Sequence, residues 1–561
     1  MILERLLETN RNKVLLIGAV ISVGLVSAFA YHSILGYFFT GTDTVTLIET
    51  SRIHSFKDFT RIFSEPLMAG SKFVDIAKFF RPVASLSYAL DYSIWNLNPF
   101  GFQLTNLLLN ASVACLVVGV MYLLCNGNIL FAWLSGLIFA LHPILVDSVP
   151  ATDRRHDIIA ALFLLLSLFL FLKSKISGSN KKWLLCCSLF SYVLALGGKE
   201  IAIILPVLIF TQIFIFSTNG RWIERAYLSL RQSFPFFLTT AGYLIWRTSV
   251  LKGLGGYLRG VPLTWNDIQA YGANIFHNYF LDLTYPADLF GVFDTKLANL
   301  WTFLMLSAFS LYLVLFLWGL SSRKGPSYTQ KSIKLLSFLV SWLLIPFILF
   351  VVTLTFAHRS MYISAIPFSA LLAYPLAECI KHFRTVLTEF RINPSVGVKT
   401  CFCYKSEKLV LILGLSMLSF LLAYSPIIRP YDQWEASGRM GRMILTKLAS
   451  GTRQVNQDCR VDLYNLPNCL RSYEKREPKA KDVTYLSDYS IKSWLNLCGF
   501  QKKMDVIIHS RSQPWDFSGD LSVAILKLGK QNLRAIVRIR PLAKRNSPVW
   551  IPSKISQERR P

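Results

Sequence analysis

Apolar segments separated by short polar loops make up most of the chain as far as residue 427. These segments are close to the length of about 17 to 25 residues that a helix needs to cross the hydrocarbon core of a bilayer. We therefore predict a polytopic α-helical membrane protein with about eleven transmembrane helices. The predicted helices are at 14–36, 104–124, 129–146, 157–172, 183–198, 201–216, 233–250, 299–320, 335–356, 361–379 and 409–427.

Lysine and arginine in the short loops predict how these helices are oriented, because positive charge is retained on the cytoplasmic side of a membrane. If the N-terminus lies inside, every strongly basic short loop falls on that side. These loops are at 173–182, 221–231, 323–334 and 381–408. The same count places four segments on the extracytoplasmic side, at 37–103, 142–156, 251–298 and 428–561.

One segment, 183–216, has two interpretations. Lys199 and Glu200 separate two short apolar halves, which could instead form a single bent hairpin. A single span there would place the next three basic loops outside. We therefore predict two spans.

The polar tail forms a second region of the chain. Its length, about 134 residues, is enough for one small domain. A helix is predicted near 433–448, and strand-like patterns lie at 460–464, 506–508 and 535–539. We therefore divide the chain into a transmembrane module, 1–427, and an extracytoplasmic C-terminal domain of α/β or α+β type, 428–561.

The first extracytoplasmic loop, 37–103, contains two amphipathic stretches. Apolar residues recur at helical spacing within 52–64, and 83–95 is similar. Such helices can lie in the membrane surface or pack on the tail domain, and the neighbouring spans favour the membrane surface. The aromatic stretch at 265–290 also suits that boundary.

Composition and charge agree with a membrane protein. Of 561 residues, 53% are hydrophobic and 16% are charged, and 59 Lys+Arg against 32 Asp+Glu give a net charge of +27. Nucleic-acid binders carry such an excess on one solvated face, whereas here it lies between apolar runs, so we expect no nucleic-acid partner. Ten irregularly spaced cysteines without a Cys-x2-Cys pair indicate neither a disulfide scaffold nor structural zinc.

Ionisable residues collect near helix ends on the predicted outer side. Such groups are costly at membrane depth, and a cluster of them is typical of a substrate path or a reaction site. They occur at Asp43, at Arg81, at His142 and Asp147, in Asp153-Arg154-Arg155-His156-Asp157, in Lys199-Glu200 and in His358-Arg359.

Local explanations remain open for several of these residues. Asp153 or Thr152 could cap the fourth helix, and arginines beside it could face lipid headgroups. His142, before a proline, could be a helix stop. Lys199 and Glu200 could form a structural ion pair.

Short motifs in matching order resemble one group of C-type integral membrane glycosyltransferases, the transmembrane tetratricopeptide-repeat O-mannosyltransferases and their bacterial relatives. The resemblance covers about residues 1–380. The motifs are Phe80-Arg81-Pro82 with Leu90-Asp91-Tyr92, the run at 98–110, Phe139-Ala140-Leu141-His142-Pro143 with Val146-Asp147, the run at 155–163, Gly198-Lys199-Glu200-Ile201-Ala202, and His358-Arg359-Ser360-Met361-Tyr362-Ile363.

The resemblance implies an inverting transfer of a sugar from a polyprenyl-phosphate-linked donor to an acceptor hydroxyl on the extracytoplasmic face. The acceptor could be a protein, a lipid or a glycan. Asp43 matches the position of the general base. The candidates to bind the donor phosphate are Arg81, Arg154, Arg155, Lys199 and Arg359. Candidates for substrate-binding or supporting roles are His142, Asp147, His156, Asp157, Glu200 and His358.

The expected partners are the lipid-linked donor, the acceptor and membrane lipids, in a bacterial plasma membrane or, for a eukaryotic protein, the endoplasmic reticulum. A divalent metal on Asp43, His142, Asp147 and His156 is not favoured, because their spacing is not diagnostic. No cofactor is assigned.

Three departures from the family pattern keep other functions open. Asp43 follows Thr42 and has no acidic neighbour in sequence, His358 and Ser360 replace an acidic and an aromatic residue, and tetratricopeptide repeats are absent. An inactive glycolipid-binding scaffold is one alternative. A glycolipid transporter or flippase is another, although transporters tend to show related halves, which this sequence does not.

Overall fold

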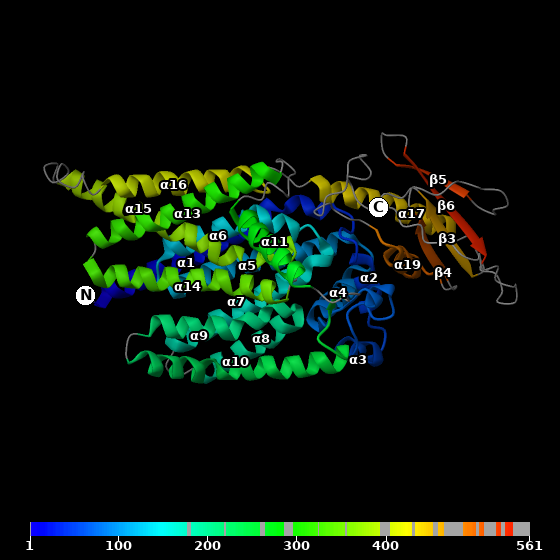
Figure 1. Ribbon diagram of the computed structural model, residues 1–561, viewed down its shortest axis with the longest axis horizontal. Helices are drawn as coiled ribbons and strands as arrows, with labels where there is room; N and C mark the ends of the chain where they lie inside the picture. The colour runs from blue at the N-terminus through cyan, green and yellow to red at the C-terminus, as the bar shows by residue number, and fades with distance from the viewer. Residues whose placement is uncertain are drawn as a thin grey trace.

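The structure, a computed structural model, is an elongated bundle of helices with a small sheet beyond one end (Figure 1). The N-terminal end of α1 lies at the opposite end of the bundle (Figure 1). The described residues are 2–176, 181–217, 220–257, 264–284, 295–323, 325–353, 356–392, 404–428, 432–452, 458–464, 486–500, 504–509, 523–528 and 533–541.

Each of the eleven predicted apolar segments is largely helical. These helices run roughly along the long axis of the molecule (Figure 1). They are α1 (Ile2–Ala30), α5 (Pro99–Leu124), α6 (Ile129–Ala140), α7 (Arg155–Ile176), α8 (Lys181–Gly198), α9 (Leu205–Phe216), α10 (Trp222–Leu251), α13 (Thr295–Arg323), α14 (Gly325–Thr353), α15 (Ala365–Ile392) and α16 (Tyr404–Ala423).

Five segments are long and apolar enough to cross a membrane by length and composition: Arg11–Ala30, Pro99–Leu124, Thr152–Ile176, Tyr328–Thr353 and His358–Thr385. Four shorter apolar helices accompany them. The number of crossings therefore stays a prediction, while the mostly helical class is confirmed. The disputed segment 183–216 contains two separate helices, because α8 ends at Gly198 and the short helix η5 (Glu200–Ile204) precedes α9.

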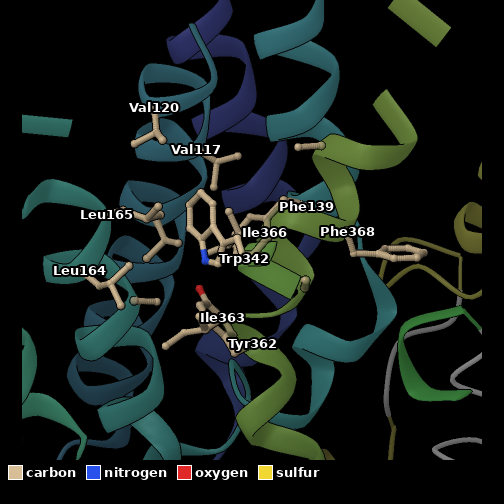
Figure 2. Close-up of a cluster of buried hydrophobic side chains, with 14 of the residues drawn as sticks. Val117, Val120, Phe139, Leu164, Leu165, Trp342, Tyr362, Ile363, Ile366 and Phe368 are labelled. Atoms are coloured by element: carbon tan, nitrogen blue, oxygen red, sulfur yellow. The ribbon is translucent and has the colours of Figure 1, made fainter. Parts of the chain in front are cut away.

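The centre of the bundle is a continuous apolar core to which α5, α6, α7, α14 and α15 all contribute. Trp342 of α14 is fully buried there, among valines, leucines and aromatic rings of the neighbouring helices (Figure 2). Gly136 of α6 allows close packing, since a Cβ there would lie 2.5 Å from Val118 of α5. Small residues commonly bring membrane helices together in this way.

Short elements cover the end of the bundle that faces the tail. The first outer loop forms η1 (His32–Gly36), α2 (Thr44–Ser51), α3 (Phe56–Ser64), η2 (Lys72–Asp75), β1 (Ala77–Lys78) and α4 (Pro82–Trp95). The later connections form η3 (Pro143–Asp147), η4 (Thr152–Arg154), β2 (Gly256–Tyr257), α11 (Trp265–Thr284) and η6 (His358–Tyr362). Strand β2 pairs antiparallel with β1.

The predicted amphipathic stretches are helices α3 and α4. A capping box of Ser55 and Asp58 begins α3, none of its residues is buried, and Phe56 is 80% exposed. Helix α4 instead packs inward through Ala84, Tyr88 and Asp91. Of the aromatic stretch at 265–290, residues 285–290 lie outside the described residues.

The tail contains a mixed four-stranded sheet in the order β4-β3-β6-β5. Its strands β3 and β4 are parallel, whereas β6 pairs antiparallel with both β3 and β5. The predicted tail helix and strands are present, and sequence reasoning missed α19 and β5. The tail elements are α17 (Asp432–Thr452), β3 (Cys459–Tyr464), α19 (Asp488–Leu497), β4 (Met504–His509), β5 (Val523–Leu528) and β6 (Leu533–Pro541).

A second hydrophobic cluster joins the tail to the first outer loop. Trp494 of α19 makes edge contacts with the rings of Phe38 and Phe39, and Tyr489 makes one with Phe73. Trp434 of α17 donates a 3.0 Å hydrogen bond from its indole nitrogen to the Val146 carbonyl. The tail is therefore packed against the end of the bundle where the predicted site residues lie.

Candidate active site

Two half-buried aspartates, distant in sequence, meet at the end of the bundle. Asp43 stands just before α2, and its backbone N–H donates to Oδ2 of Asp153 at 3.4 Å. Asp153 lies in η4, directly before α7. Asp43 therefore has an acidic neighbour after all, supplied 110 residues further along the chain.

The segment before Asp43 is built to admit Asp153. Gly41 has φ +90°, and a Cβ on it would lie 2.0 Å from Oδ1 of Asp153. Thr40 fixes the two loops together, because its hydroxyl accepts hydrogen bonds from the Gln103 side-chain amide at 3.1 Å and the Thr152 backbone at 3.4 Å. A larger residue at position 41 would displace the acidic pair.

The tail supplies the hydrogen-bond donor to the Asp43 carboxylate. The hydroxyl of Tyr489, in α19, donates to Oδ1 of Asp43 at 2.7 Å. Among the described residues, Oδ2 of Asp43 has no hydrogen-bond partner, and Oδ1 of Asp153 is buried without one. Buried carboxylate oxygens are normally bonded, so the unbonded Oδ1 of Asp153 is unusual, and Oδ2 of Asp43 remains available to a ligand.

Burial raises the pKa of Asp43. The Tyr489 hydrogen bond and the positive charges of Arg359, Arg154 and Arg81 oppose this rise. Burial, together with the facing Asp43 carboxylate, also raises the pKa of Tyr489. Its hydroxyl therefore keeps its proton and remains a donor to Asp43.

Of the five cations predicted to bind phosphate, Arg359 alone forms no ion pair with a carboxylate among the described residues. It lies in η6, and its guanidinium donates to the Tyr257 hydroxyl at 3.4 Å. It makes no ion pair within the part of the chain that the structure describes. The hydroxyl of Ser148, which follows η3, donates a 3.4 Å hydrogen bond to the Arg359 backbone carbonyl. This contact connects η6 to η3.

Arg154 is close to the acidic pair but has its own partner. Its guanidinium donates to the side chain and the backbone carbonyl of Asp147. The guanidinium also lies 4.9 Å from the centre of the Trp434 ring. Asp147 and Trp434 thus hold Arg154 in place from opposite parts of the chain.

Arg81 and Glu200 form a bidentate ion pair, with nitrogen to oxygen distances of 3.1 and 2.9 Å. Arg247 of α10 approaches the same carboxylate at 3.8 Å. Glu200 therefore joins the first outer loop, the break between α8 and α9, and α10. Its own carboxylate is committed to the two arginines.

Lys199 pairs with Asp157 of α7, and its ammonium also donates to the Ser360 hydroxyl at 3.3 Å. Nε2 of His156 lies 3.2 Å from the other Asp157 oxygen. Ser360 is the residue after Arg359 in η6, so the contacts of Lys199 with Asp157 and Ser360 connect η6 to α7. The adjacent Lys199 and Glu200 do not pair with each other but with different helices.

Arg155 is wholly buried and connects α7 to α4 and α5. Its guanidinium lies 2.6 Å from the Asp91 carboxylate and donates to Asn106 at 2.7 Å and to the Phe102 carbonyl at 2.8 Å. Its side chain is 0% exposed. Arg155, predicted to bind the donor phosphate, therefore makes these contacts inside the fold, with Asp91, Asn106 and the Phe102 carbonyl.

Two of the three predicted histidines, His142 and His358, contact residues of α11. Nε2 of His142 lies 3.1 Å from the Leu283 carbonyl, and its Nδ1 accepts the Ile144 backbone N–H at 3.2 Å, so it caps η3. His358 contacts the Asp282 carboxylate through Nδ1. Asp282 of α11 was not a predicted site residue.

The four residues considered for a metal site do not gather. Asp147 faces Arg154 and His142 faces Leu283, apart from the Asp43 carboxylate. No group of three or more histidine, cysteine or acidic side chains with metal-binding geometry occurs among the described residues. The acidic pair alone offers too few ligands to define a metal centre.

Parts of the chain match known enzymes in sequence. Protein O-mannosyl-transferase TMTC2 of Homo sapiens is 29% identical over 178 residues, which are 31% of this chain and 21% of that protein. The Xenopus laevis tmtc2 protein is 31% identical over 146 residues, 25% of this chain and 17% of the relative. The chain is similar in sequence to protein O-mannosyl-transferases. The resemblance predicted from the motifs is thereby confirmed, over about a fifth of the length of these relatives.

Two solved structures match the chain at lower sequence identity. ArnT from Cupriavidus metallidurans, bound to undecaprenyl phosphate, is 13% identical with a TM-score of 0.43, covering 94% of this chain and 97% of that one. The oligosaccharyltransferase of Archaeoglobus fulgidus is 11% identical with a TM-score of 0.42, covering 87% of this chain and 63% of that one. No family model matches the chain.

Sequence reasoning missed the partners that complete the site. Asp153 was considered as a possible helix cap, whereas in the structure it contacts Asp43. Gly41 was the one residue in the sequence that could have indicated this close approach. Tyr489, Trp434, Tyr257 and Asp282 carried no signal. Tyr489 and Trp434 join the site through the packing of the tail, Tyr257 through β2 and Asp282 through α11.

Proposed function

We propose that the protein is an inverting membrane glycosyltransferase, which moves a sugar from a polyprenyl-phosphate-linked donor to an acceptor hydroxyl. The observation that carries the proposal is the half-buried pair Asp43 and Asp153 beside Arg359, a cation without an ion pair among the described residues. Glycosyl transfer from a phosphate requires a carboxylate to accept the proton of the acceptor hydroxyl and a cation to stabilise the leaving phosphate. The similarity to O-mannosyl-transferases supports it.

Asp43 is the general base. Its Oδ2 has no hydrogen-bond partner among the described residues, so an acceptor hydroxyl can take that position. Because burial raises the pKa of Asp43, its carboxylate binds a proton more readily than an exposed one does. Burial, together with the neighbouring Asp43 carboxylate, raises the pKa of Asp153 to about 6, since two carboxylates in one place disfavour double ionisation.

Arg359 stabilises the phosphate. Its guanidinium can donate two parallel hydrogen bonds to phosphate oxygens without first leaving a carboxylate. Arg81, Arg154 and Lys199 contribute positive charge from within their ion pairs. Arg155 has a structural role in this proposal, and so do Asp157, Glu200 and Asp147, which hold the cations in position.

The reaction is a single displacement. The acceptor oxygen gives its proton to Asp43 and bonds to the anomeric carbon, while the bond from that carbon to the phosphate oxygen breaks. The electron pair of that bond leaves with the lipid phosphate, where Arg359 meets the added negative charge. Attack opposite to the leaving group inverts the anomeric carbon.

The site faces the extracytoplasmic side in this proposal, as the basic loops predict. The tail lies on that side as well, because it packs on the same end of the bundle. The inactive-scaffold alternative depended on a lone Asp43, and Asp153 weakens that argument. The acceptor is a hydroxyl of a protein, a lipid or a glycan.

The test uses the purified full-length protein in lipid nanodiscs. Dolichyl phosphate carrying radiolabelled mannose is supplied with a peptide rich in serine and threonine, and labelled peptide is measured. We expect transfer by the natural protein and a loss of about 100-fold or more in the Asp43→Asn variant. Other polyprenyl-phosphate sugars and lipid or glycan acceptors are then substituted in turn.

The matched control is Asp75→Asn, which removes an exposed carboxylate of the same outer loop and should leave transfer unchanged. Undiminished transfer by Asp43→Asn would exclude Asp43 as the base. In sealed vesicles, movement of intact lipid-linked sugar between leaflets without transfer would favour the flippase.

A further inference from the structure

The tail places one functional group in contact with the proposed base. Tyr489 is the second residue of α19, and its hydroxyl reaches Oδ1 of Asp43 across 446 residues of sequence. No other side chain donates a hydrogen bond to the Asp43 carboxylate among the described residues. A hydrogen bond to one oxygen fixes the orientation of a carboxylate and leaves the other oxygen for a substrate.

Several contacts hold Tyr489 at this place. Its ring meets Phe73 at 6.1 Å between centroids. The preceding residue, Asp488, forms a 3.0 Å ion pair with Lys72 of the outer loop. Further along α19, the Asn496 amide donates to Glu49 at 3.4 Å. Helix α19 is thus docked along α2, the helix that Asp43 precedes.

Helix α19 is also fixed within the tail. The Trp494 indole donates to the Leu445 carbonyl of α17 at 3.0 Å, and Ser487 caps the start of α19 with a capping box. Tyr489 stands in the first turn, directly after this cap. A rigid first turn holds the hydroxyl within a narrow range of positions.

We propose that Tyr489 is a positioning residue that the tail supplies to the transfer reaction, holding Oδ1 of Asp43 so that Oδ2 faces the acceptor hydroxyl. The inference rests on the proposed function. It assigns the tail a direct part in the chemistry, beyond anchoring or solubility.

The hydrogen bond has a second consequence for the base. Donation to the ionised carboxylate favours that form and so opposes the effect of burial on the pKa of Asp43. The charged groups that face Asp43 are Arg359 of η6, Arg154 and Asp153 of η4, and Arg81 before α4. The arginines favour the ionised form and Asp153 disfavours it. Loss of the Tyr489 hydroxyl therefore shifts the base toward its protonated, inactive form.

The test is Tyr489→Phe, which keeps the ring contact with Phe73 and removes the hydroxyl. The transfer rate is measured from acid to alkaline pH with the dolichyl phosphate mannose assay. We expect the acid limb of the pH profile to move to higher pH, and the rate at the acid end to fall about tenfold. The KM for the lipid donor should stay unchanged, because in this proposal Tyr489 acts through Asp43 and Arg359 binds the donor phosphate.

Two control variants separate the hydroxyl from general packing. Tyr92→Phe removes a hydroxyl within the same hydrophobic cluster, one without a hydrogen-bond partner among the described residues, and should leave the profile unchanged. Lys72→Ala weakens the docking of α19 but keeps the hydroxyl, so the acid limb should stay in place. Melting temperatures show whether each variant is folded.

The outcomes are distinct. An acid limb that moves in Tyr489→Phe alone supports the inference. A profile that is unchanged in folded Tyr489→Phe, or that moves as far in Lys72→Ala, overturns it while the proposed function stands. No transfer by the natural protein with any lipid-linked sugar would contradict the proposed function itself, and the inference with it.

Discussion

Two groups of charges lie at the same end of the bundle and differ in burial and in how far their charges are paired. Around Arg155, every contact is internal, with Asp91, Asn106 and a backbone carbonyl as partners. Around Asp43, one oxygen of each aspartate has no partner among the described residues, and Arg359 has no ion pair. Removing one partner of a buried ion pair destabilises a fold, whereas a charged group without a partner remains available to a substrate.

The adjacent arginines 154 and 155 show this difference within one motif. Arg155 turns into the helix junction with 0% of its side chain exposed, and Arg154 keeps 20% exposed beside Trp434. The distinction depends on which face of η4 and α7 each residue occupies. A change to either group should therefore give a different kind of defect.

The largest effect is expected for Arg155→Met. This change leaves Asp91 as an unpaired buried charge, which should cost about 3–5 kcal/mol of folding free energy. Thermal unfolding in detergent should show a large loss of stability or of folded protein. Adding Asp91→Asn should restore part of the loss, because no unpaired charge then remains. A stable Arg155→Met protein that lacked only transfer would instead place Arg155 in the catalytic group.

Next in size is Arg359→Gln, which should lower transfer about 100-fold and leave the melting temperature unchanged. The reason is that Arg359 has no ion pair to break in the described structure, but meets charge that develops on the leaving phosphate. The control is Arg442→Gln, an exposed arginine of α17 that should be silent in both measurements. A destabilised Arg359→Gln protein with normal transfer would reverse this assignment.

The helical class could be predicted from the sequence because apolar length is a local property of the chain. The helices at all eleven predicted segments, and the break at Lys199, follow from such local patterns. The positions of Asp43, Arg359 and Lys199 at one end also followed from loop counting. These features need no knowledge of which helices touch.

The partners of each charge could not be predicted, because they depend on packing between distant segments. Lys199 and Glu200 are adjacent in sequence, yet one pairs with Asp157 of α7 and the other with Arg81 of the outer loop. Asp43 looked alone because its acidic neighbour comes from η4. Tyr489 could not be assigned at all, since nothing in α19 indicates that it docks beside α2.

A smaller effect, of opposite sign, is expected for the stability of Asp43→Asn. Burial raises the pKa of Asp43 above its value in the unfolded chain, so ionisation of this group opposes folding. The cost is absent at acid pH, where Asp43 is protonated in both states, and grows as the pH rises. Melting temperatures should therefore show Asp43→Asn equal to the natural protein at acid pH and more stable at neutral pH.

Asp75→Asn is the control for this comparison, because an exposed carboxylate carries no such cost. A lower melting temperature of Asp43→Asn at neutral pH would mean that the Asp43 carboxylate stabilises the fold. Asp43 would then belong with Arg155 among the satisfied charges.

The smallest effect is expected for Lys72→Ala. This change breaks the solvent-exposed ion pair between Lys72 and Asp488, which, like the buried pair of Arg155 and Asp91, joins a basic side chain to an aspartate. The Lys72 and Asp488 side chains are 51% and 32% exposed, so their 3.0 Å contact should contribute only about 0.2–1 kcal/mol. The loss should shrink further at high salt, because exposed charges are screened. Thermal unfolding at two salt concentrations measures both. If Lys72→Ala lowered stability as much as Arg155→Met, burial would not explain why some ion pairs of this protein stabilise the fold more than others. The docking of α19 would then depend on charge rather than on the contacts of Trp494 with Phe38 and Phe39.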